Sequence, residues 1–271
     1  AEAAVALYVL ATLALPVAAL LATALVKTYG LPLTAETLTW ENFAQVLLHQ
    51  DVTLRAFTNS TLVAGLAALL LAGLAVVLSY YLDRRRHRAA RHASGAVQAL
   101  ADVAYAIPGL VISIAFILAI LRPLPDLGVS LYNTLWIIGL AYVCAYCAVA
   151  LKPVAAALAA LDPALDDAAR VAGAGFGRRM RRIYLPLAAP AAASGAILVF
   201  LTAYNEVTGS ALLWSTGNET IGTTIFNYED GGYTTLAAAM SAVTVAATLI
   251  LMAVLHVAGR RLPPGVVPWR V

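Results

Sequence analysis

Six long stretches of almost entirely apolar residues constrain this chain more than any other feature. A helix needs about 20 predominantly apolar residues to cross the hydrocarbon core of a bilayer. The six segments are approximately Ala3–Val26, Ser60–Leu82, Val97–Leu121, Asn133–Leu151, Leu187–Leu213 and Leu236–Val257. Only 11% of the 271 residues are charged, which is too few to cover the surface of a soluble domain of this size. The sequence therefore predicts an all-α integral membrane protein with six transmembrane helices in a single domain, residues 1–271.

The first and third apolar segments each contain a proline. The first segment lacks the basic n-region of a secretory signal and is longer than the apolar part of such a signal, so we expect a spanning helix. Pro16 does not contradict this, because neighbouring groups in a membrane helix can satisfy the freed carbonyl. In the third segment, the Pro108-Gly109 pair predicts a kink or a partial break.

The distribution of Lys and Arg predicts the orientation of the chain. All of the 17 basic residues except Lys27, Arg55 and Arg122 fall in the 83–92 connection, in the 152–186 connection or in the C-terminal tail. Since basic loops remain in the cytoplasm, we expect these two connections and both termini on the cytoplasmic side. The net charge of +3 then reflects topology, and we expect no nucleic-acid partner.

The longest of these connections, from about Lys152 to Pro186, has a helical pattern of its own. Asp162 can cap a helix, Pro163 suits its first position, and acidic residues in the next turns favour the helix dipole. We expect a helix of roughly three turns, with three glycines that end it and then a basic run. These features are Asp166, Asp167, Gly173, Gly175, Gly177 and residues 178–182. An alternative interpretation is an interfacial amphipathic helix with basic flanks.

The residues of this connection resemble a known family motif. Asp167-Ala168-Ala169, three residues, Gly173, nine residues and Ile183-x-Leu185-Pro186 resemble the EAA-x3-G-x9-I-x-L-P loop of binding-protein-dependent ABC importer permeases. Asp167 replaces the family's Glu, which shortens the side chain by one methylene. The resemblance implies a MetI-like bundle whose cytoplasmic coupling helix docks onto a separate ATPase. The implied ATPase-coupling residues are Asp167, Ala168, Ala169, Gly173, Ile183, Leu185 and Pro186.

The same resemblance implies the remaining parts of a transporter in a bacterial cytoplasmic (inner) membrane. These are two ATPase subunits, a second permease subunit that is identical or homologous, and a soluble substrate-binding protein. The chain has no G-x-x-x-x-G-K-[ST] sequence with which to cradle a nucleotide phosphate. We therefore expect a transport subunit that is not an enzyme and binds no cofactor, with ATP and Mg at the partner ATPase.

Weaker similarities favour iron(III)-type permeases among the members of this family. They include Ala203-Tyr204-Asn205-Glu206 and the run from Thr223 to Tyr228. Related phosphonate, thiamine, polyamine and sulfate permeases share parts of this pattern, so these substrates stay open beside iron(III). A different class, an ion-coupled secondary transporter or channel that uses Glu206 or Asp102, would leave the 152–186 connection unexplained.

Ionisable residues inside the apolar segments are candidates for the translocation path, because they are costly there and usually face a bundle interior or a wet cavity. Asp102 and Glu206 are such residues, and Tyr204 and Asn205 extend a polar stripe beside Glu206. The alternatives are a structural hydrogen bond or ion pair between helices for Glu206 and a loop arginine as partner of Asp102.

Two further pairs of residues attract attention. On the outward side, Glu229-Asp230 precedes Gly231-Gly232 and is the candidate docking point for a binding protein. Cys144 and Cys147 have a C-x-x-C spacing, but no second Cys or His pair lies nearby to complete a metal site. We interpret the cysteines as packing residues and expect no metal centre.

Overall fold

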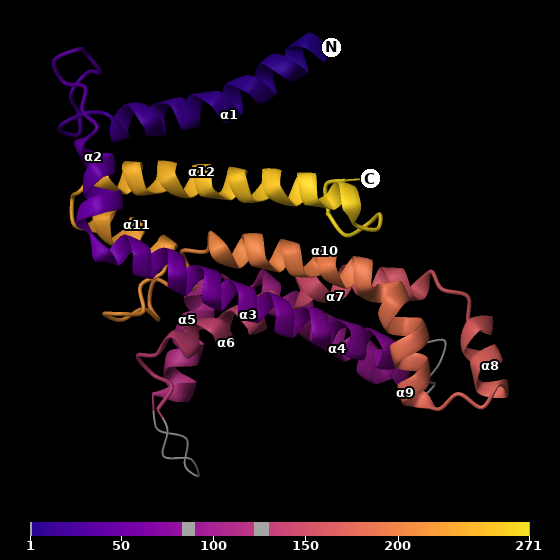
Figure 1. Ribbon diagram of the computed structural model, residues 1–271. Coiled ribbons are helices and arrows are strands. Elements are labelled where there is room, and N and C mark those ends of the chain that lie inside the picture. Colours follow the sequence, from indigo (N-terminus) through magenta and orange to yellow (C-terminus); the bar gives the residue numbers. More distant parts are fainter. Residues whose placement is uncertain (1, 83–89, 122–129, 271) are drawn as a thin grey trace.

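The computed structural model describes residues 2–82, 90–121 and 130–270 (Figure 1). Apart from an isolated bridge between Val26 and Leu38, the regular structure in these ranges is helical, so the predicted all-α class is confirmed. The helices are α1 (Glu2–Ala24), α2 (Glu41–Ala44), η1 (Gln45–His49), α3 (Asp51–Leu82), α4 (Ala90–Ala106), α5 (Gly109–Ile120), α6 (Leu135–Ala145), α7 (Cys147–Ala159), α8 (Ala164–Val171), α9 (Phe176–Arg179), η2 (Met180–Tyr184), α10 (Leu185–Tyr204), α11 (Ile221–Asp230), α12 (Thr234–Ala258) and η3 (Gly259–Arg261).

Each of the six predicted apolar segments corresponds to a helix or to a bent pair of helices. Four continuous helices are long and apolar enough to cross a bilayer, and they are Glu2–Ala24, Asp51–Tyr81, Phe176–Tyr204 and Thr234–Arg261. The pairs α4–α5 and α6–α7 satisfy the same criteria together, with bends of 108° and 42°. By length and composition the described residues therefore contain four spans, or up to six if each bent pair is one span.

Several predicted boundaries were wrong. Helix α3 begins at Asp51 rather than at Ser60, and α7 continues past Leu151 to Ala159, so Lys152 lies in a helix and not in a connection. The basic run 178–182 is also helical, because α9, η2 and α10 follow one another without interruption. Hydropathy locates the apolar part of a helix, whereas its hydrogen-bonded ends extend into the polar region.

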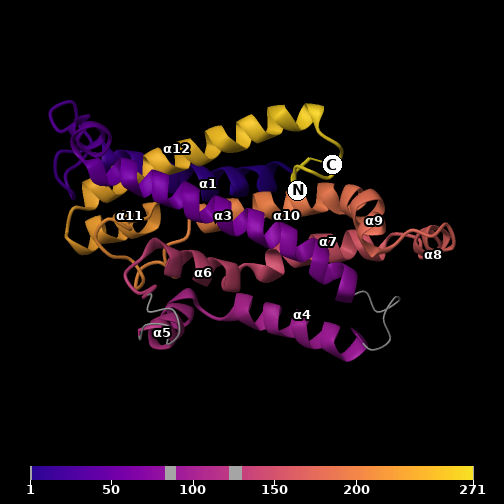
Figure 2. The same cartoon turned by 60° about the horizontal axis from the view of Figure 1, so that its bottom comes forward.

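The predicted break at Pro108-Gly109 is confirmed. Proline has no N–H to continue the helix, and the carbonyl of Pro108 instead accepts the N–H of Val111 at 2.9 Å as α5 begins. Figure 2 shows α4 beside α6 and α7, with α5 turned across the end of the bundle. The bend at Tyr146 between α6 and α7 was not predicted, since neither proline nor glycine marks it.

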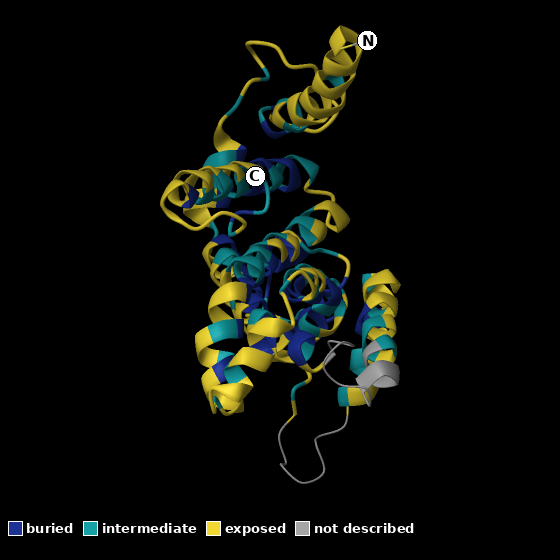
Figure 3. Cartoon of the chain, turned by 90° about the vertical axis from the view of Figure 1, so that its right-hand side faces the viewer, coloured by how far each residue is buried: buried dark blue, intermediate teal, exposed yellow. Residues whose placement is uncertain are grey.

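Helices α3, α7 and α10 form the centre of the bundle, with α6 packed against α3. Small residues allow their backbones to approach: Ala64 and Ala188 are fully buried, and a Cβ on Gly195 would lie 3.2 Å from the carbonyl oxygen of Ala150. Helix α1 packs mainly along α12 and exposes most of its apolar side chains (Figure 3). Such a surface suits a lipid or protein neighbour inside a membrane.

The two ends of the bundle differ in what they present. Helix α8 and both ends of the described chain lie at one end of the bundle, while α2 and α11 lie at the opposite end (Figure 1). This arrangement agrees with an even number of spans. The basic residues Arg84, Arg85, Arg86 and Arg88, which contributed to the predicted orientation, lie outside the described residues.

Candidate functional site

Helix α8 is a short, well-terminated helix at the end of the bundle. Its first turn is capped as predicted, because Asp162 Oδ1 accepts the N–H of Ala164 at 2.9 Å. At its other end the N–H groups of Gly173 and Ala174 donate to the carbonyls of Arg170 and Ala169, each at 2.9 Å. These bonds form a Schellman motif, and Gly173 adopts the left-handed φ of +74° that the motif requires.

Two details of the α8 prediction were wrong. The helix has 8 residues, about two turns, whereas roughly three were expected. Gly173 ends it without help from the other two glycines, because Gly175 has an ordinary φ of −65° and Gly177 lies inside α9. The Schellman motif completes the hydrogen bonding at Gly173, so no further breaker is needed.

An ion pair attaches α8 to α9. Asp166 is 3% exposed, and both of its carboxylate oxygens accept hydrogen bonds from Nη1 of Arg179 at 3.0 Å. Arg170, one turn further along α8, also lies 2.9 Å from this carboxylate. We had interpreted Asp166 only as a charge favourable to the helix dipole. The i,i+4 spacing could have indicated Arg170, but no local signal predicts Arg179.

The coupling-motif residues lie on both sides of this attachment. Asp167 and Ala168 are exposed on α8, Ala169 is half-buried, and the neighbouring Leu165 and Val171 are 46% and 90% exposed. In the following segment Ile183 is half-buried, while Leu185 and Pro186 are exposed at the start of α10. Helix α8 thus presents a partly apolar surface at the end of the bundle, which is a common property of protein contact sites.

An aromatic cluster that the sequence analysis missed joins this region to α3. Tyr184 is 1% exposed, and its ring centroid lies 4.7 Å from that of Tyr80 on α3. Phe176, the first residue of α9, lies 5.4 Å from the same Tyr80 ring. Edge-to-face contacts of this kind stabilise the packing beyond the area that they bury.

The second candidate region is the turn that follows α10. Glu206 was expected inside a spanning helix, but α10 ends at Tyr204 and Glu206 begins a tight turn. Its carboxylate accepts hydrogen bonds from the N–H of Gly209, from the N–H of Ser210 at 3.0 Å and from the hydroxyl of Thr208 at 2.8 Å. These local donors compete with the helix and end it.

The starts of α5 and α11 enclose this turn on two sides. A Cβ on Gly109 would lie 2.6 Å from the hydroxyl oxygen of Thr208, and a Cβ on Gly222 would lie 2.2 Å from the carbonyl oxygen of Glu206. Both positions therefore require glycine. Ser113 on α5 adds a hydrogen bond from its hydroxyl to the carbonyl of Gly209.

A cavity of about 130 Å³ adjoins the Glu206 turn. It is lined by Tyr105, Ile107, Gly109, Ile112, Ala141, Tyr142, Ala145, Tyr146, Glu206, Thr208 and Gly209. Tyr142 is 2% exposed, and its hydroxyl makes no hydrogen bond within the described residues. The lining provides carboxylate, phenol and hydroxyl oxygens and includes no Lys, Arg or His. The cavity can accommodate several water molecules or a small ligand that oxygen atoms bind.

The predicted polar stripe beside Glu206 does not form. Tyr204 is 8% exposed and packs against Phe57 and Phe200, with centroids 6.4 and 5.3 Å away. Asn205 accepts a hydrogen bond from Thr248 of α12 at 3.3 Å. The three neighbours point in different directions because the helix ends between Tyr204 and Asn205.

Asp102 does not share the cavity of Glu206. Its carboxylate lies 2.8 Å from Nζ of Lys152, and both side chains are at least half exposed. This pair joins α4 to α7 and lines a separate cavity of about 180 Å³ with Gln98 and Leu151. The alternative interpretation, an ion pair with a loop arginine, is therefore correct in kind but not in partner, because the partner is a lysine on a neighbouring helix.

At the opposite end of the bundle, Glu229 and Asp230 are exposed at the end of α11. Glu229 accepts a hydrogen bond from the Thr234 hydroxyl at 3.3 Å, and Gly232 closes the turn with a φ of +77°. Tyr233, beside them, is 61% exposed.

Cys144 and Cys147 are free thiols. In the part of the chain that the structure describes, no three His, Cys, Asp or Glu side chains gather as metal ligands.

A further carboxylate, on Glu219, was not singled out from the sequence. It is 6% exposed and lies 3.4 Å from Nε of Arg55 on α3, while the N–H of Gly217 donates to it at 2.9 Å. Burial by itself would raise the pKa of Glu219, but the Gly217 N–H, its own N–H and Arg55 outweigh burial and lower the pKa. Asn59 donates to the carbonyl of Glu219 at 2.9 Å and further fixes this loop on α3.

Comparison with known proteins gives these elements a context. Residues 90–267 match the family described as "Binding-protein-dependent transport system inner membrane component". A probable ABC transporter permease, y4fN of Sinorhizobium fredii, is 28% identical over 70% of this chain and 33% of its own length. The Fe(3+)-transport system permease FbpB 2 of Haemophilus influenzae is 28% identical over 65% of this chain and 33% of its own length. The chain therefore spans about a third of the length of these two relatives.

Other relatives and solved structures differ in what they transport. The molybdate/tungstate permease WtpB of Thermococcus kodakarensis is 29% identical over 59% of this chain and 60% of its own length. A bacterial ABC transporter that imports alginate has the same fold, with a TM-score of 0.70 and 16% identity over 95% of this chain and 93% of the matched chain. The MetNI methionine transporter gives a TM-score of 0.58 and 22% identity over 77% of this chain and 93% of the matched chain. Since the family match covers well over half of the sequence, the chain belongs to the family of binding-protein-dependent transport system inner membrane components, the ABC permeases that its 167–186 motif resembles.

Proposed function

We propose that this chain is the transmembrane subunit of an ATP-binding-cassette importer and forms part of its translocation path. The observation that carries this proposal is the construction of α8. The helix exposes Asp167, Ala168 and Val171 to a partner, while the buried Asp166–Arg179 pair fixes it to the bundle. An ATPase that moves this surface would therefore move the membrane helices as well. Two such ATPase subunits would bind ATP and Mg.

The route of this movement through the chain follows from the packing. A displacement of α8 passes through Arg179 into α9, and α9 is continuous with α10 as far as Tyr204. The Tyr80–Tyr184 contact transmits the same displacement to α3. At the far end of α10 lies the Glu206 turn, which contacts α5 and α11. The cavity would then have two conformations. ATP would favour the conformation in which the attached ATPase binds ATP more tightly.

The other partners occupy the remaining surfaces in this proposal. Helix α8 faces the cytoplasm of a bacterial cell and the inner membrane surrounds the bundle, with both termini on the cytoplasmic side, as the basic residues predict. A soluble substrate-binding protein docks at the opposite end, where Glu229, Asp230 and Tyr233 are exposed. A second permease subunit, identical or homologous, completes the path.

For the cargo we propose iron(III). The cavity beside Glu206 contains a carboxylate, three phenol groups and a hydroxyl, and none of its lining residues is basic. Carboxylate and phenol oxygens are suitable neighbours for a small, highly charged cation, whereas an oxyanion would require N–H or cationic donors. An iron(III) cargo also agrees with the name of one relative, the Fe(3+)-transport system permease of Haemophilus influenzae. Molybdate, tungstate and 2-aminoethylphosphonate, named for other relatives, are the competing cargoes, beside thiamine, polyamines and sulfate.

An ion-coupled transporter that uses Asp102 or Glu206 receives less support from the geometry. Asp102 is paired with Lys152, and the carboxylate of Glu206 already accepts three hydrogen bonds. A carboxylate that binds a coupling ion needs free oxygen ligands in at least one state. In this arrangement Asp102 is neutralised by Lys152, so only Glu206, whose Oε2 accepts a single hydrogen bond, keeps an oxygen that could bind a cation. A coupling ion at Glu206 would also leave the construction of α8 without a role.

Site-directed cross-linking tests the coupling proposal. In a variant without Cys144 and Cys147, Ala168→Cys should cross-link to the partner ATPase subunit, and Tyr233→Cys at the opposite end should not. Uptake by proteoliposomes that contain both subunits and the binding protein should require ATP. Cross-linking at position 233 instead of 168, or gradient-driven uptake without the ATPase, would contradict the proposal.

Competition among Fe(III), molybdate and a phosphonate in the same uptake assay identifies the cargo.

A further inference from the structure

The chain after α12 forms a preorganised loop at the end of that helix. The N–H of Val266 donates to the carbonyl of Pro263 at 3.4 Å, and the N–H of Arg270 donates to that of Val267 at 3.0 Å. Val267 is 3% exposed and packs on Gly259, where a Cβ would lie only 2.6 Å from Cγ2 of Val267. The loop is therefore packed against the end of α12 and is not a loose tail.

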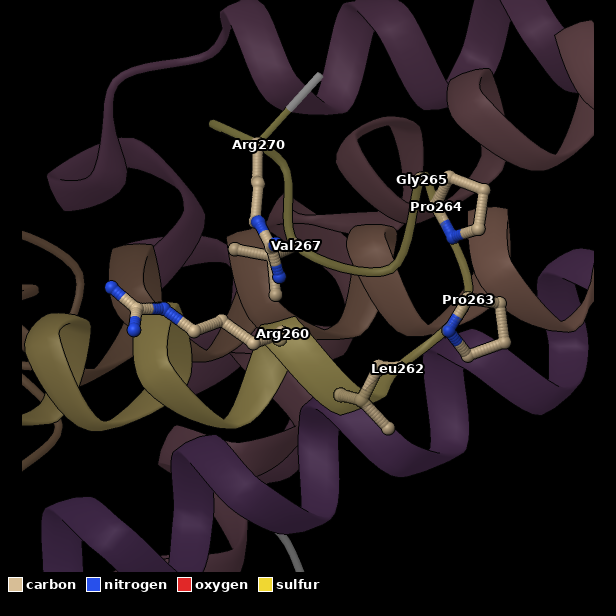
Figure 4. Close-up of a pocket in the computed structure, with 8 residues that line it drawn as sticks. Arg260, Leu262, Pro263, Pro264, Gly265, Val267 and Arg270 are labelled. Atoms are coloured by element: carbon tan, nitrogen blue, oxygen red, sulfur yellow. The ribbon is translucent and has the colours of Figure 1, made fainter.

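This loop encloses a pocket of about 200 Å³. Its lining residues are Gly259, Arg260, Leu262, Pro263, Pro264, Gly265, Val267 and Arg270. In Figure 4 the side chain of Arg270 descends beside Val267 toward the end of α12, where Arg260 begins, and Leu262 and the two prolines form the other side. Arg260 extends from the same helix end away from the prolines, so Arg270 is the arginine that lies over the loop and Arg260 lies at the pocket's edge. Two arginines and an apolar wall thus line the pocket.

The charge of this segment is entirely positive. Between Gly259 and Arg270 the sequence contains three arginines and no Asp or Glu. Within the described ranges, neither Arg260 nor Arg270 forms an ion pair. Guanidinium groups that lack a carboxylate partner are suited to phosphate, whose oxygens match their paired N–H donors.

The helix that leads to the pocket has an exposed apolar surface. Leu249, Ile250, Val254 and Val257 of α12 are each at least 58% exposed, and Leu262, which lines the pocket, is 46% exposed. Gly265 lies beside Pro190 of α10, since a Cβ there would be 3.9 Å from Cβ of Pro190. Helix α8 lies farther out at the same end of the molecule (Figure 1).

We propose that this pocket binds the phosphate group of an anionic phospholipid, with Arg260 and Arg270 as its ligands. The acyl chains would lie along the exposed apolar surface of α12, and Trp269 in the loop would lie at headgroup level, where tryptophan is enriched. Basic pockets beside the cytoplasmic ends of membrane helices are suited to anionic headgroups. The bound lipid would fix the end of α12 at the membrane surface.

Lipid retention by the purified chain tests this site without any ATPase, so the result is independent of the proposed function. Native mass spectrometry would compare phosphatidylglycerol with phosphatidylcholine for the wild type, for Arg260→Gln/Arg270→Gln and for Arg261→Gln. Arg261 has the same charge and lies next to Arg260 but does not line the pocket. The double variant should lose the preference for phosphatidylglycerol by about tenfold or more, and Arg261→Gln should change it by less than about threefold.

Three results would overturn the proposal: an unchanged preference in the double variant, an equal loss in Arg261→Gln, or displacement of the lipid by millimolar inorganic phosphate. The last result would identify free phosphate as the ligand. Unfolding temperatures measured in phosphatidylcholine verify that the double variant is folded. If it is not, Arg270→Lys tests the same point, because lysine keeps the charge and loses the paired donors; it should weaken retention by several-fold, and unchanged retention would count against the site.

Discussion

The α8 connection and the Glu206 turn are both organised by a carboxylate, but they solve different problems. Asp166 is buried in an ion pair with Arg179, and the surface around it faces outward. Glu206 accepts only neutral donors from its own turn, and its surroundings are the starts of two other helices. The element that we propose docks onto an ATPase must be rigid by itself, whereas an internal turn must match its neighbours.

The largest effect should come from Gly173. Gly173→Val places a β-branched side chain at a φ of +74°, which opposes the Schellman motif and should redirect the chain after α8. We expect loss of ATPase binding and of ATP-dependent uptake, measured by co-purification and in proteoliposomes. Gly175→Val is the matched control, because Gly175 has a φ of −65° and nothing within 4 Å of an added Cβ. Equal ATP-dependent uptake by the two variants would mean that the Schellman motif at Gly173 is not what keeps α8 rigid.

The next largest effect separates two adjacent aspartates. Asp166→Ala leaves the buried Arg179 without its carboxylate and should lower the free energy of unfolding by about 3–5 kcal/mol. Asp167→Ala, on the exposed side of the same turn, should leave stability within about 0.5 kcal/mol but weaken ATPase binding. Unfolding temperature in detergent and ATPase co-purification measure the two effects. If both variants lost only stability, or both only binding, the division of roles between them would be wrong.

The two regions also differ in how far the sequence predicted them. Around α8 the signals are local: Asp162 caps, Gly173 ends the helix, and the motif spacing identifies the family. Around Glu206 the decisive residues, Gly109 and Gly222, are about a hundred positions apart, and no local pattern indicates that they meet. Hydropathy continued to Leu213 there, and so it assigned a helix where a turn forms. Arg179 was missed for the same reason as Gly222, since tertiary contacts leave no periodicity in the sequence.

The packing of the Glu206 turn can be tested at Gly222. Gly222→Ala adds a Cβ that would lie 2.2 Å from the carbonyl oxygen of Glu206, so the turn and α11 must separate. We expect the free energy of unfolding to fall by about 1–3 kcal/mol. In Gly139→Ala the nearest atom to the added Cβ is 3.7 Å away, and this control should be neutral or slightly stabilising. A neutral Gly222→Ala would show that the turn is adaptable and not enclosed.

The smallest effect concerns Glu219, a carboxylate that combines features of the other two, with both an arginine and backbone N–H groups as partners. Because its pKa in the folded protein is lowered, the ionised form stabilises the fold. This contribution is complete above the ordinary glutamate pKa of about 4.3, and it is lost as the pH falls through the lowered folded value. We expect the unfolding temperature of the wild type to decline below about pH 4.3 more steeply than that of Glu219→Gln. At neutral pH the free energy of unfolding of the two proteins should differ by about 1 kcal/mol. Arg55→Gln should reduce this acid dependence without abolishing it, because the N–H donor of Gly217 remains. Identical acid profiles for wild type and Glu219→Gln would mean that the ionised carboxylate does not fasten the 205–220 loop to α3.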